Sequence, residues 1–203
     1  EFTANVSHEL KTPLMSISGY AELMMNGMVP QDKMQDFSGR IYHESERLSN
    51  LVADIIQLSR LDEKNGETMF EPVDLGELGE DVINNLQNRA AKKKIRLEYA
   101  GDSAQIQGVR HVLYEMFYNL TDNAIRYTSE GGEVKVFVGK LNGKSYFRVE
   151  DNGIGIPENE QQRIFERFYR VDKSHSRETG GTGLGLSIVK HGAALHYAKI
   201  LLD

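Results

Sequence analysis

The first sixty residues carry apolar side chains at helical spacing. Phe2, Val6, Leu10, Ile17 and Met24 recur at intervals of four or seven residues, as one face of an amphipathic helix requires. A second apolar set repeats near a 3.5-residue period from Gln31 onward: Met34, Phe37, Ile41, Leu48, Leu51, Ile55 and Leu58. The stretch NGMVPQD at 26–32 contains a Gly and a Pro, which predicts the turn of an αα-hairpin.

A lone hairpin buries only one face of each helix. Self-association into a four-helix bundle covers the other faces, so the pattern predicts a homodimer. We place this helical-hairpin domain at 1–64 and a polar, Gly-containing linker at 65–73.

Beyond the linker, the spacing of apolar residues alternates between helix-like and strand-like periods, which indicates a second domain over 74–203. Helices are predicted at 74–93 and 109–127, and a strand at 95–99. Two alternating runs over 132–151 meet at Asn142-Gly143, a strong hairpin signal. A short helix is expected near 158–165 and a last helix from about 184. Helices with a partly antiparallel sheet predict an α/β sandwich, so the chain is α+β multidomain.

Composition narrows the function classes. The chain is 39% hydrophobic and 27% charged with 4 Pro, which is globular. A net charge of -6 argues against a nucleic-acid binder and requires local positive groups or a metal for any bound polyphosphate. Without Cys, disulfides and Cys-based zinc sites are excluded. No run of about 18 apolar residues is present, and the absence of an initiator Met leads us to expect a fragment of a longer protein.

Two glycine-rich stretches are candidate ligand sites. DNGIGIP at 151–157 follows a predicted strand, so Asp151 can accept a hydrogen bond from an exocyclic amine and the glycines permit close approach. Its alternative interpretation is a plain Asn-Gly turn. GGTGLGL at 180–186 opens a helix, where free N–H groups and the helix dipole favour phosphate. A dinucleotide fingerprint is excluded because the preceding stretch is polar rather than a strand.

Two further stretches carry candidate polar chemistry. Asn119 and Asn123 lie four apart on one helix face, where amide oxygens can bind a hard cation such as Mg²⁺; the alternative is a solvated pair. NVSHELKTPL at 5–14 places His8 and Thr12 on one face beside Glu9. Pro13 leaves the Glu9 carbonyl without its helical partner, so a bend near His8 is expected. Neutral imidazole is a competent nucleophile, although a lone histidine is more often a solvated bystander.

These stretches together resemble the sensor histidine kinases of two-component signalling over essentially the whole chain. SHELKTPL is similar to the family's H box and NLTDNAIRYT to its N box. DNGIGIP, FERFYR and GGTGLGLSIVK are similar to its G1, F and G2 boxes, in the same order. The resemblance implies a gyrase/chaperone/histidine-kinase type ATP-binding domain after the hairpin.

The family implies a role at each matching position. His8 would be the phosphoacceptor, Glu9 the general base and Thr12 the residue that orients water during dephosphorylation of the partner. ATP and Mg²⁺ would be the cofactors, with Asn123 as principal metal ligand and Asn119 beside it. The remaining nucleotide-binding positions would be Arg126, Tyr127, Asp151, Gly153, Gly155, Phe165, Phe168, Arg170, Gly181, Thr182, Gly183, Leu184 and Gly185. Residues 170–179 would form a lid over ATP, anchored by Phe165 and Phe168.

The resemblance also implies partners and location. A response-regulator receiver domain would accept the phosphoryl group on an Asp, and phosphatase activity toward it would accompany the kinase. The fragment would be cytoplasmic and touch neither nucleic acid nor membrane, within a membrane-anchored bacterial parent.

Three departures from the family pattern and two alternative functions stay open. Arg126 stands where the family commonly has Lys, and His196-Tyr197-Ala198 where it often has a Gly pair; a last strand hairpin is also missing, as if truncated. The alternatives are a gyrase- or chaperone-type ATPase, which uses a carboxylate at the position of Asn119, and a non-catalytic dimeric scaffold.

Overall fold

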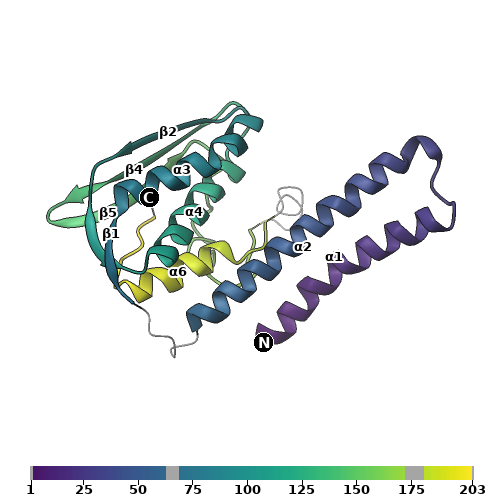
Figure 1. Ribbon diagram of the computed structural model, residues 1–203, viewed down its shortest axis with the longest axis horizontal. Coiled ribbons are helices and arrows are strands. Elements are labelled where there is room, and N and C mark those ends of the chain that lie inside the picture. Colours follow the sequence, from purple (N-terminus) through teal and green to yellow (C-terminus); the bar gives the residue numbers. More distant parts are fainter. Residues whose placement is uncertain (1, 63–68, 172–180, 203) are drawn as a thin grey trace. The chain divides into compact units, whose positions relative to one another are not determined.

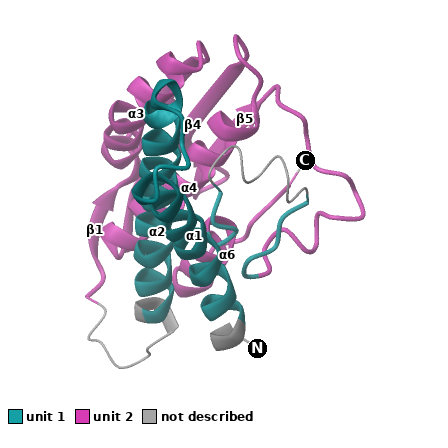
Figure 2. Ribbon diagram, turned by 90° about the vertical axis from the view of Figure 1, so that its right-hand side faces the viewer, with its two compact units in different colours: residues 1–62, 167–184 teal, residues 63–166, 185–203 magenta. Residues whose placement is uncertain are grey.

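The computed structural model describes residues 2–62, 69–171 and 181–202. The chain divides into two compact units (Figure 2). Unit 1 contains residues 1–62 and 167–184, and unit 2 contains residues 63–166 and 185–203. The domain boundaries expected from the sequence remain predictions.

Unit 1 is built on an antiparallel helical hairpin, α1 (Phe2–Met25) and α2 (Met34–Asp62) (Figure 1). Between them a turn with Gly27 at φ 67° leads into the short 3-10 helix η1 (Gln31–Lys33). The rings of Tyr20 and Phe37 meet edge to face at 5.5 Å across the hairpin. The predicted αα-hairpin is therefore confirmed.

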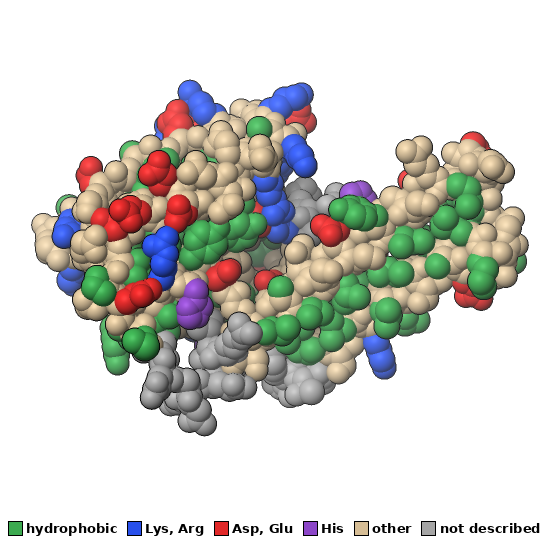
Figure 3. Space-filling view, viewed as in Figure 1, with side chains coloured by type: hydrophobic (Ala, Val, Ile, Leu, Met, Phe, Trp, Pro, Cys, Tyr) green, Lys and Arg blue, Asp and Glu red, His purple; other side chains and the backbone are tan. Residues whose placement is uncertain are grey.

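The two helices bury some apolar positions and expose others. Leu51 and Leu58 of α2 are buried, whereas Leu14, Met15 and Val52 are exposed. Figure 3 shows hydrophobic side chains along the visible face of both helices. Exposed apolar side chains on both helices are what a further helix pair would cover.

Unit 2 contains a three-stranded sheet in the order β2-β4-β5. Strand β2 (Arg96–Gly101) runs parallel to β4 (Glu133–Leu141), and β4 runs antiparallel to β5 (Lys144–Asp151). The β4–β5 turn has positive φ at Asn142 (51°) and Gly143 (77°), the geometry that favours Asn-Gly. The predicted hairpin is confirmed at its expected turn.

Helices in the described part of unit 2 complete the sandwich (Figure 1). Helices α3 (Leu75–Lys92) and α4 (Arg110–Tyr127) pack on the sheet, and α6 (Gly185–Leu195) packs against α4. Alternate positions of β4 are buried, as one covered sheet face requires. Phe117 of α4 stacks on Phe147 of β5 with ring centroids 3.7 Å apart. The helix that carries the candidate asparagines is thereby fixed to the sheet.

Two short strands were not predicted. Strands β1 (Glu71–Asp74) and β3 (Gln105–Gly108) form an antiparallel ribbon, and β1 begins inside the expected linker. Asp74 ends β1 and caps α3, because its Oδ1 accepts from the N–H groups of Gly76 (2.7 Å) and Glu77 (3.4 Å). The same carboxylate accepts from Ser103, from the Ala104 N–H and from the Gln105 side chain.

The prediction of a helix near 158–165 is wrong. This stretch forms successive turns instead, with the N–H groups of Glu160 and Arg163 bonded three residues back, to Pro157 and Glu160. So short a segment gains too few bonds to propagate an α-helix. The expected lid at 170–179 falls largely on residues 172–180, outside the described part. Residues 198–202, after α6, form neither helix nor strand.

Candidate functional site

The centre of the candidate site in unit 1 is the pair His8 and Glu9 on α1. The His8 side chain is 81% exposed, whereas that of Glu9 is 27% exposed. His8 Nδ1 lies 4.0 Å from Glu9 Oε1. An accessible imidazole therefore has a carboxylate near one of its two ring nitrogens, at a distance that must shorten or be bridged by one water molecule before a proton can pass.

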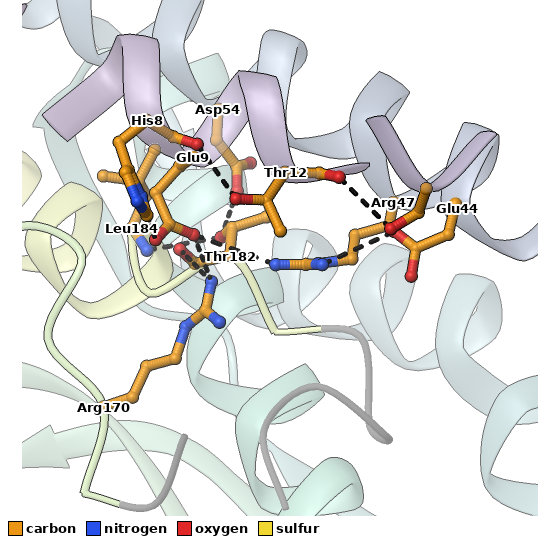
Figure 4. A network of polar contacts seen from close by, with 10 residues as sticks. His8, Glu9, Thr12, Glu44, Arg47, Asp54, Arg170, Thr182 and Leu184 are labelled. Atoms are coloured by element: carbon orange, nitrogen blue, oxygen red, sulfur yellow. Dashed lines mark hydrogen bonds and ion pairs between the residues drawn. The ribbon is translucent and has the colours of Figure 1, made fainter. Parts of the chain in front are cut away.

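The other oxygen of the Glu9 carboxylate faces two arginines (Figure 4). Oε2 lies 3.3 Å from Arg170 Nη2 and 3.8 Å from Arg47 Nη2. The Arg47 side chain also pairs with Glu44 at 3.5 Å. Both arginine side chains are largely buried, so solvent screens these pairs less than it would at the surface.

Thr12 lies one turn after His8 on the same helix. Its Oγ1 donates to the His8 carbonyl oxygen at 3.2 Å, which leaves the lone pairs of the hydroxyl available as acceptors. Pro13 is buried within α1, and the helix continues past it to Met25. Because Pro has no N–H, the Glu9 carbonyl lacks its usual helical partner.

In unit 1, residues 181–184 of the glycine-rich stretch lie next to Phe168 of the FERFYR segment. Phe168 has a positive φ of 64°, and its N–H donates to the Gly183 carbonyl at 2.8 Å. Gly183, at φ 76°, would place a Cβ 3.0 Å from Phe168 backbone atoms, so a side chain there would be strained. Leu184 is fully buried, and Gly181 is half-buried nearby in sequence.

Thr182 connects this stretch to α2. Its Oγ1 bonds to Asp54 Oδ2 at 2.6 Å and accepts from the Leu184 N–H at 3.2 Å. The Thr182 carbonyl accepts from Arg170 Nη2 at 3.0 Å. A continuous polar network therefore joins Glu9 to Asp54 through Arg170 and Thr182 (Figure 4).

The candidate asparagines lie on α4 in unit 2. Asn119 Nδ2 donates to the Glu115 carbonyl at 2.9 Å, which turns Oδ1 outward from the helix backbone. A Cβ added at Gly185, the first residue of α6, would lie 2.6 Å from that Oδ1. Asn123 is half-buried. The glycine thus keeps open a close approach that any larger residue would fill.

Arg126 turns toward a buried carboxylate. Its Nη2 lies 2.7 Å from Asp122 Oδ2, and Arg89 of α3 lies 2.6 Å from the other oxygen. Lys93 Nζ donates to the carbonyls of Ile125 (3.1 Å) and Arg126 (2.6 Å) at the end of α4. Burial lowers the pKa of Lys93, and the neighbouring charges of Arg126 and Arg89 lower it further. Three cations therefore gather at the carboxyl end of the asparagine helix.

The DNGIGIP stretch follows β5. Asp151 is exposed, and its Oδ1 accepts from the Gly153 N–H at 2.9 Å. The Tyr127 carbonyl accepts from the Ile154 N–H at 3.3 Å, and a Cβ at Gly153 would lie 2.5 Å from that same carbonyl oxygen. Gly155 has φ 67°, and Phe165 is half-buried further on. The loop thus lies against the end of α4.

The donors in unit 2 are amide oxygens rather than a carboxylate cluster. No group of three or more His, Cys, Asp or Glu side chains within 2–62, 69–171 and 181–202 could hold a metal ion. A hard cation that keeps waters and phosphate oxygens needs only one or two protein oxygens. Asn119, with Oδ1 open toward Gly185, fits that requirement.

Two contributors to the network escaped the sequence analysis. Arg47 and Asp54 lie on α2 seven residues apart, hence on one helix face. Both border the apolar stripe that includes Leu48, Leu51 and Ile55. Two charged residues seven positions apart beside an apolar stripe were the sequence feature that could have pointed to them.

Two family models match the chain. Residues 1–64 match the model described as the His Kinase A (phospho-acceptor) domain. Residues 108–202 match the model described as the histidine kinase-, DNA gyrase B- and HSP90-like ATPase. The first covers the hairpin, and the second covers α4, the β4–β5 hairpin and α6.

A curated relative agrees with these matches. The sensor-like histidine kinase SenX3 of Mycolicibacterium smegmatis is 38% identical over 203 residues, 100% of this chain and 53% of the relative. The chain thus spans about half the length of that curated relative.

Solved structures are similar to large parts of the chain. The mycobacterial sensor histidine kinase MprB has a TM-score of 0.56 and 31% identity, covering 63% of this chain and 80% of that one. A structure of histidine kinase ThkA in complex with response regulator protein TrrA has a TM-score of 0.70 and 25% identity, covering 84% of this chain and 50% of that one.

Proposed function

The chain belongs to the sensor histidine kinases of two-component signalling, and from this premise we propose that it transfers the γ-phosphoryl group of ATP to His8. The phosphoryl group then passes to an Asp of a response-regulator receiver domain. The observation that carries the proposal is the exposed His8 imidazole with Glu9 Oε1 4.0 Å from its Nδ1.

In the proposed reaction the two nitrogens of His8 have different tasks. Nδ1 gives its proton toward Glu9, and Nε2 attacks the γ-phosphorus in line with the departing ADP oxygen. One N–P bond forms as one P–O bond breaks, and ADP leaves. The exposure of His8 supports the attack because the imidazole has to reach a donor outside its own helix.

Unit 2 supplies the residues proposed to bind the nucleotide. Asp151 would accept from the adenine amine, and Gly153 and Gly155 would admit the base beside the end of α4. Asn123 and Asn119 would hold Mg²⁺, which when bound supplies charge compensation for the phosphates. The open space between Asn119 and Gly185 supports this assignment.

We propose that the chain forms a homodimer and binds a response regulator. Exposed Leu14, Met15 and Val52 on the hairpin support pairing of two chains into a four-helix bundle. The complex of ThkA with TrrA supports a receiver domain as partner. No described helix has the length and apolar character of a bilayer span; attachment of a longer parent protein to a membrane is a prediction from the family.

We also propose phosphatase activity toward the phosphorylated regulator, through Thr12. The hydroxyl of Thr12 is one turn from His8 and is oriented by its bond to the His8 carbonyl. Its lone pairs can therefore accept from a water molecule.

The alternative of a gyrase- or chaperone-type ATPase requires a carboxylate where Asn119 stands. An amide cannot take a proton from water, so Asn119 disfavours steady hydrolysis. The scaffold alternative predicts no phosphate on the chain at all.

One incubation with γ-labelled ATP and Mg²⁺ separates these possibilities. The proposal predicts label on the chain that is lost in acid, survives in alkali and moves to a receiver domain when one is added. Continuous release of phosphate with no labelled chain would favour the ATPase, and neither product would favour the scaffold.

A further inference from the structure

We infer that Arg170 is a positioning residue that orients the Glu9 carboxylate toward His8. The inference rests on the proposed function, in which Glu9 receives the His8 proton. It assigns to Arg170 a task on the acceptor side of the reaction, separate from the nucleotide contact that the family resemblance implies for this position.

The two oxygens of Glu9 face different partners. Oε2 lies 3.3 Å from Arg170 Nη2, whereas Oε1 lies 4.0 Å from His8 Nδ1. A carboxylate is planar, so an ion pair on one oxygen fixes where the other points. Arg47 adds a longer contact of 3.8 Å to the same Oε2. The arginines thus select the orientation that presents Oε1 to the imidazole.

Arg170 is itself held in place. Its side chain is 8% exposed, and Nη2 donates both to Glu9 Oε2 and to the Thr182 carbonyl at 3.0 Å. Thr182 is anchored in turn by its 2.6 Å hydrogen bond to Asp54 of α2. Figure 4 shows the resulting connection from Asp54 to Glu9. Because α2 supports one end, the orientation of Glu9 does not depend on α1 alone.

The geometry requires a guanidinium. One Nη2 group carries two hydrogens in fixed directions within the guanidinium plane, which suits two acceptors at once. An ammonium group keeps the charge without these directions. Arg170→Lys should therefore keep only part of the activity that Arg170→Ala loses.

The decisive comparison is a double-mutant cycle with Glu9→Gln, a change that keeps the shape but removes the base. We would measure the rate of phosphohistidine formation at saturating Mg-ATP and the Kd for a fluorescent ATP analogue in the full chain. Arg170→Ala should slow the saturated rate on the order of tenfold through misplacement of Glu9. In the Glu9→Gln background the same change should have almost no effect, because there is no base left to orient.

Asp54→Ala provides a second variant outside the reacting groups. It removes the anchor of Thr182, so it should lower the saturated rate in the parent chain but not in the Glu9→Gln chain. Arg163→Ala, at an exposed arginine paired with Glu166, is the matched control and should change neither the rate nor the Kd.

Any of three results would overturn the inference. The rate losses caused by Arg170→Ala and Glu9→Gln could multiply in the double variant, as independent effects do. Alternatively, Arg170→Ala could raise only the Kd for the nucleotide, or it could leave the saturated rate unchanged. The parent chain reports on the proposed function in the same assay. If the parent forms no acid-labile phosphate, the proposed function fails; if it does and the cycle shows no coupling, only the role of Arg170 fails.

Discussion

The imidazole of His196 joins the end of α6 to the start of α4. Its Nε2 accepts a hydrogen bond from the Val109 N–H at 2.9 Å, and its Nδ1 lies 2.8 Å from the Gly192 carbonyl. The imidazole therefore carries its proton on Nδ1. Val109 is the residue before α4 and has no side-chain cap, so His196 satisfies a donor at the start of the helix that carries Asn119.

Replacing His196 with Ala should lower the free energy of unfolding by about 1–3 kcal/mol, since the Val109 N–H would be left without its acceptor. Chemical denaturation of the full chain measures the loss, and hydrogen exchange at the Val109 amide localises it. His111→Ala removes an exposed imidazole and should cost less than about 0.5 kcal/mol. Equal losses in the two variants would contradict the proposed contact.

Tyr197 occupies a backbone conformation that favours glycine. Its φ is 53° and its side chain is 95% exposed, while the Ala198 N–H bonds back to the Ala193 carbonyl at 2.8 Å, closing α6. Tyr197→Gly should raise the melting temperature, with a gain of about 1 kcal/mol from relieved strain. Ala194→Gly, within the helix, should lower stability by a similar amount. A destabilised Tyr197→Gly chain would show that the tyrosine ring contributes more than its strain costs.

Asp74 should make stability depend on pH in the acid range. The hydrogen bond from Ser103, followed by the backbone N–H groups of Gly76, Ala104 and Glu77, holds the pKa of Asp74 below its ordinary value of 3.8, although burial opposes this shift. A lowered folded-state pKa means that the ionised form stabilises the fold above the unfolded-state pKa, and that this contribution is lost as pH falls through the folded-state pKa.

Asp74→Asn tests this linkage, because the amide offers one acceptor oxygen in place of two. Parent and variant should differ in unfolding free energy by about 1–2 kcal/mol near neutral pH. The difference should be constant down to about pH 4 and shrink below it. Urea titrations at several pH values measure it, and a difference that stayed the same at the acid end would exclude a role for the charge.

Gly185→Ala should weaken nucleotide binding by closing the space beside Asn119. The added Cβ would lie 2.6 Å from Asn119 Oδ1, so the amide has to move, at an overpacking cost of about 1–3 kcal/mol. We expect a Kd for Mg-ATP raised on the order of ten- to hundredfold. Gly39→Ala adds a Cβ on α2 where nothing lies within 4 Å, and its Kd should equal that of the parent. Unchanged binding by Gly185→Ala would remove Asn119 from the nucleotide site.

The sequence predicted elements well where one physical signal dominated. Apolar periodicity specified α1 and α2, and Asn142-Gly143 specified the β4–β5 turn because both residues accept positive φ. Strands β1 and β3 escaped because each has only four residues, too few for alternation to stand out. The composition of 158–165 permits either a helix or a series of turns, so the sequence pattern does not distinguish them.

The motifs predicted which residues form the site, but not the contacts between motifs that lie far apart in the sequence. His8 and Glu9 are adjacent in the sequence, so one motif contains both residues. The contact of Arg170 with Glu9 joins residues 161 positions apart, and the bond of Thr182 to Asp54 joins residues 128 apart. Local pattern does not encode such pairs, because they depend on how distant segments pack. The same limit hid the partnership of Asp122 with Arg89 of α3. The pair of Asp122 with Arg126, four residues apart on α4, is one that helical spacing does encode.

The central claim, phosphorylation of His8, is tested most directly by the variant His8→Gln. The chain and the variant are incubated with labelled ATP and Mg²⁺, and the acid-labile phosphate on each is measured alongside its Kd for the nucleotide. The account predicts label on the parent, none on His8→Gln and an unchanged Kd in both. Acid-labile label on His8→Gln equal to that of the parent would contradict it.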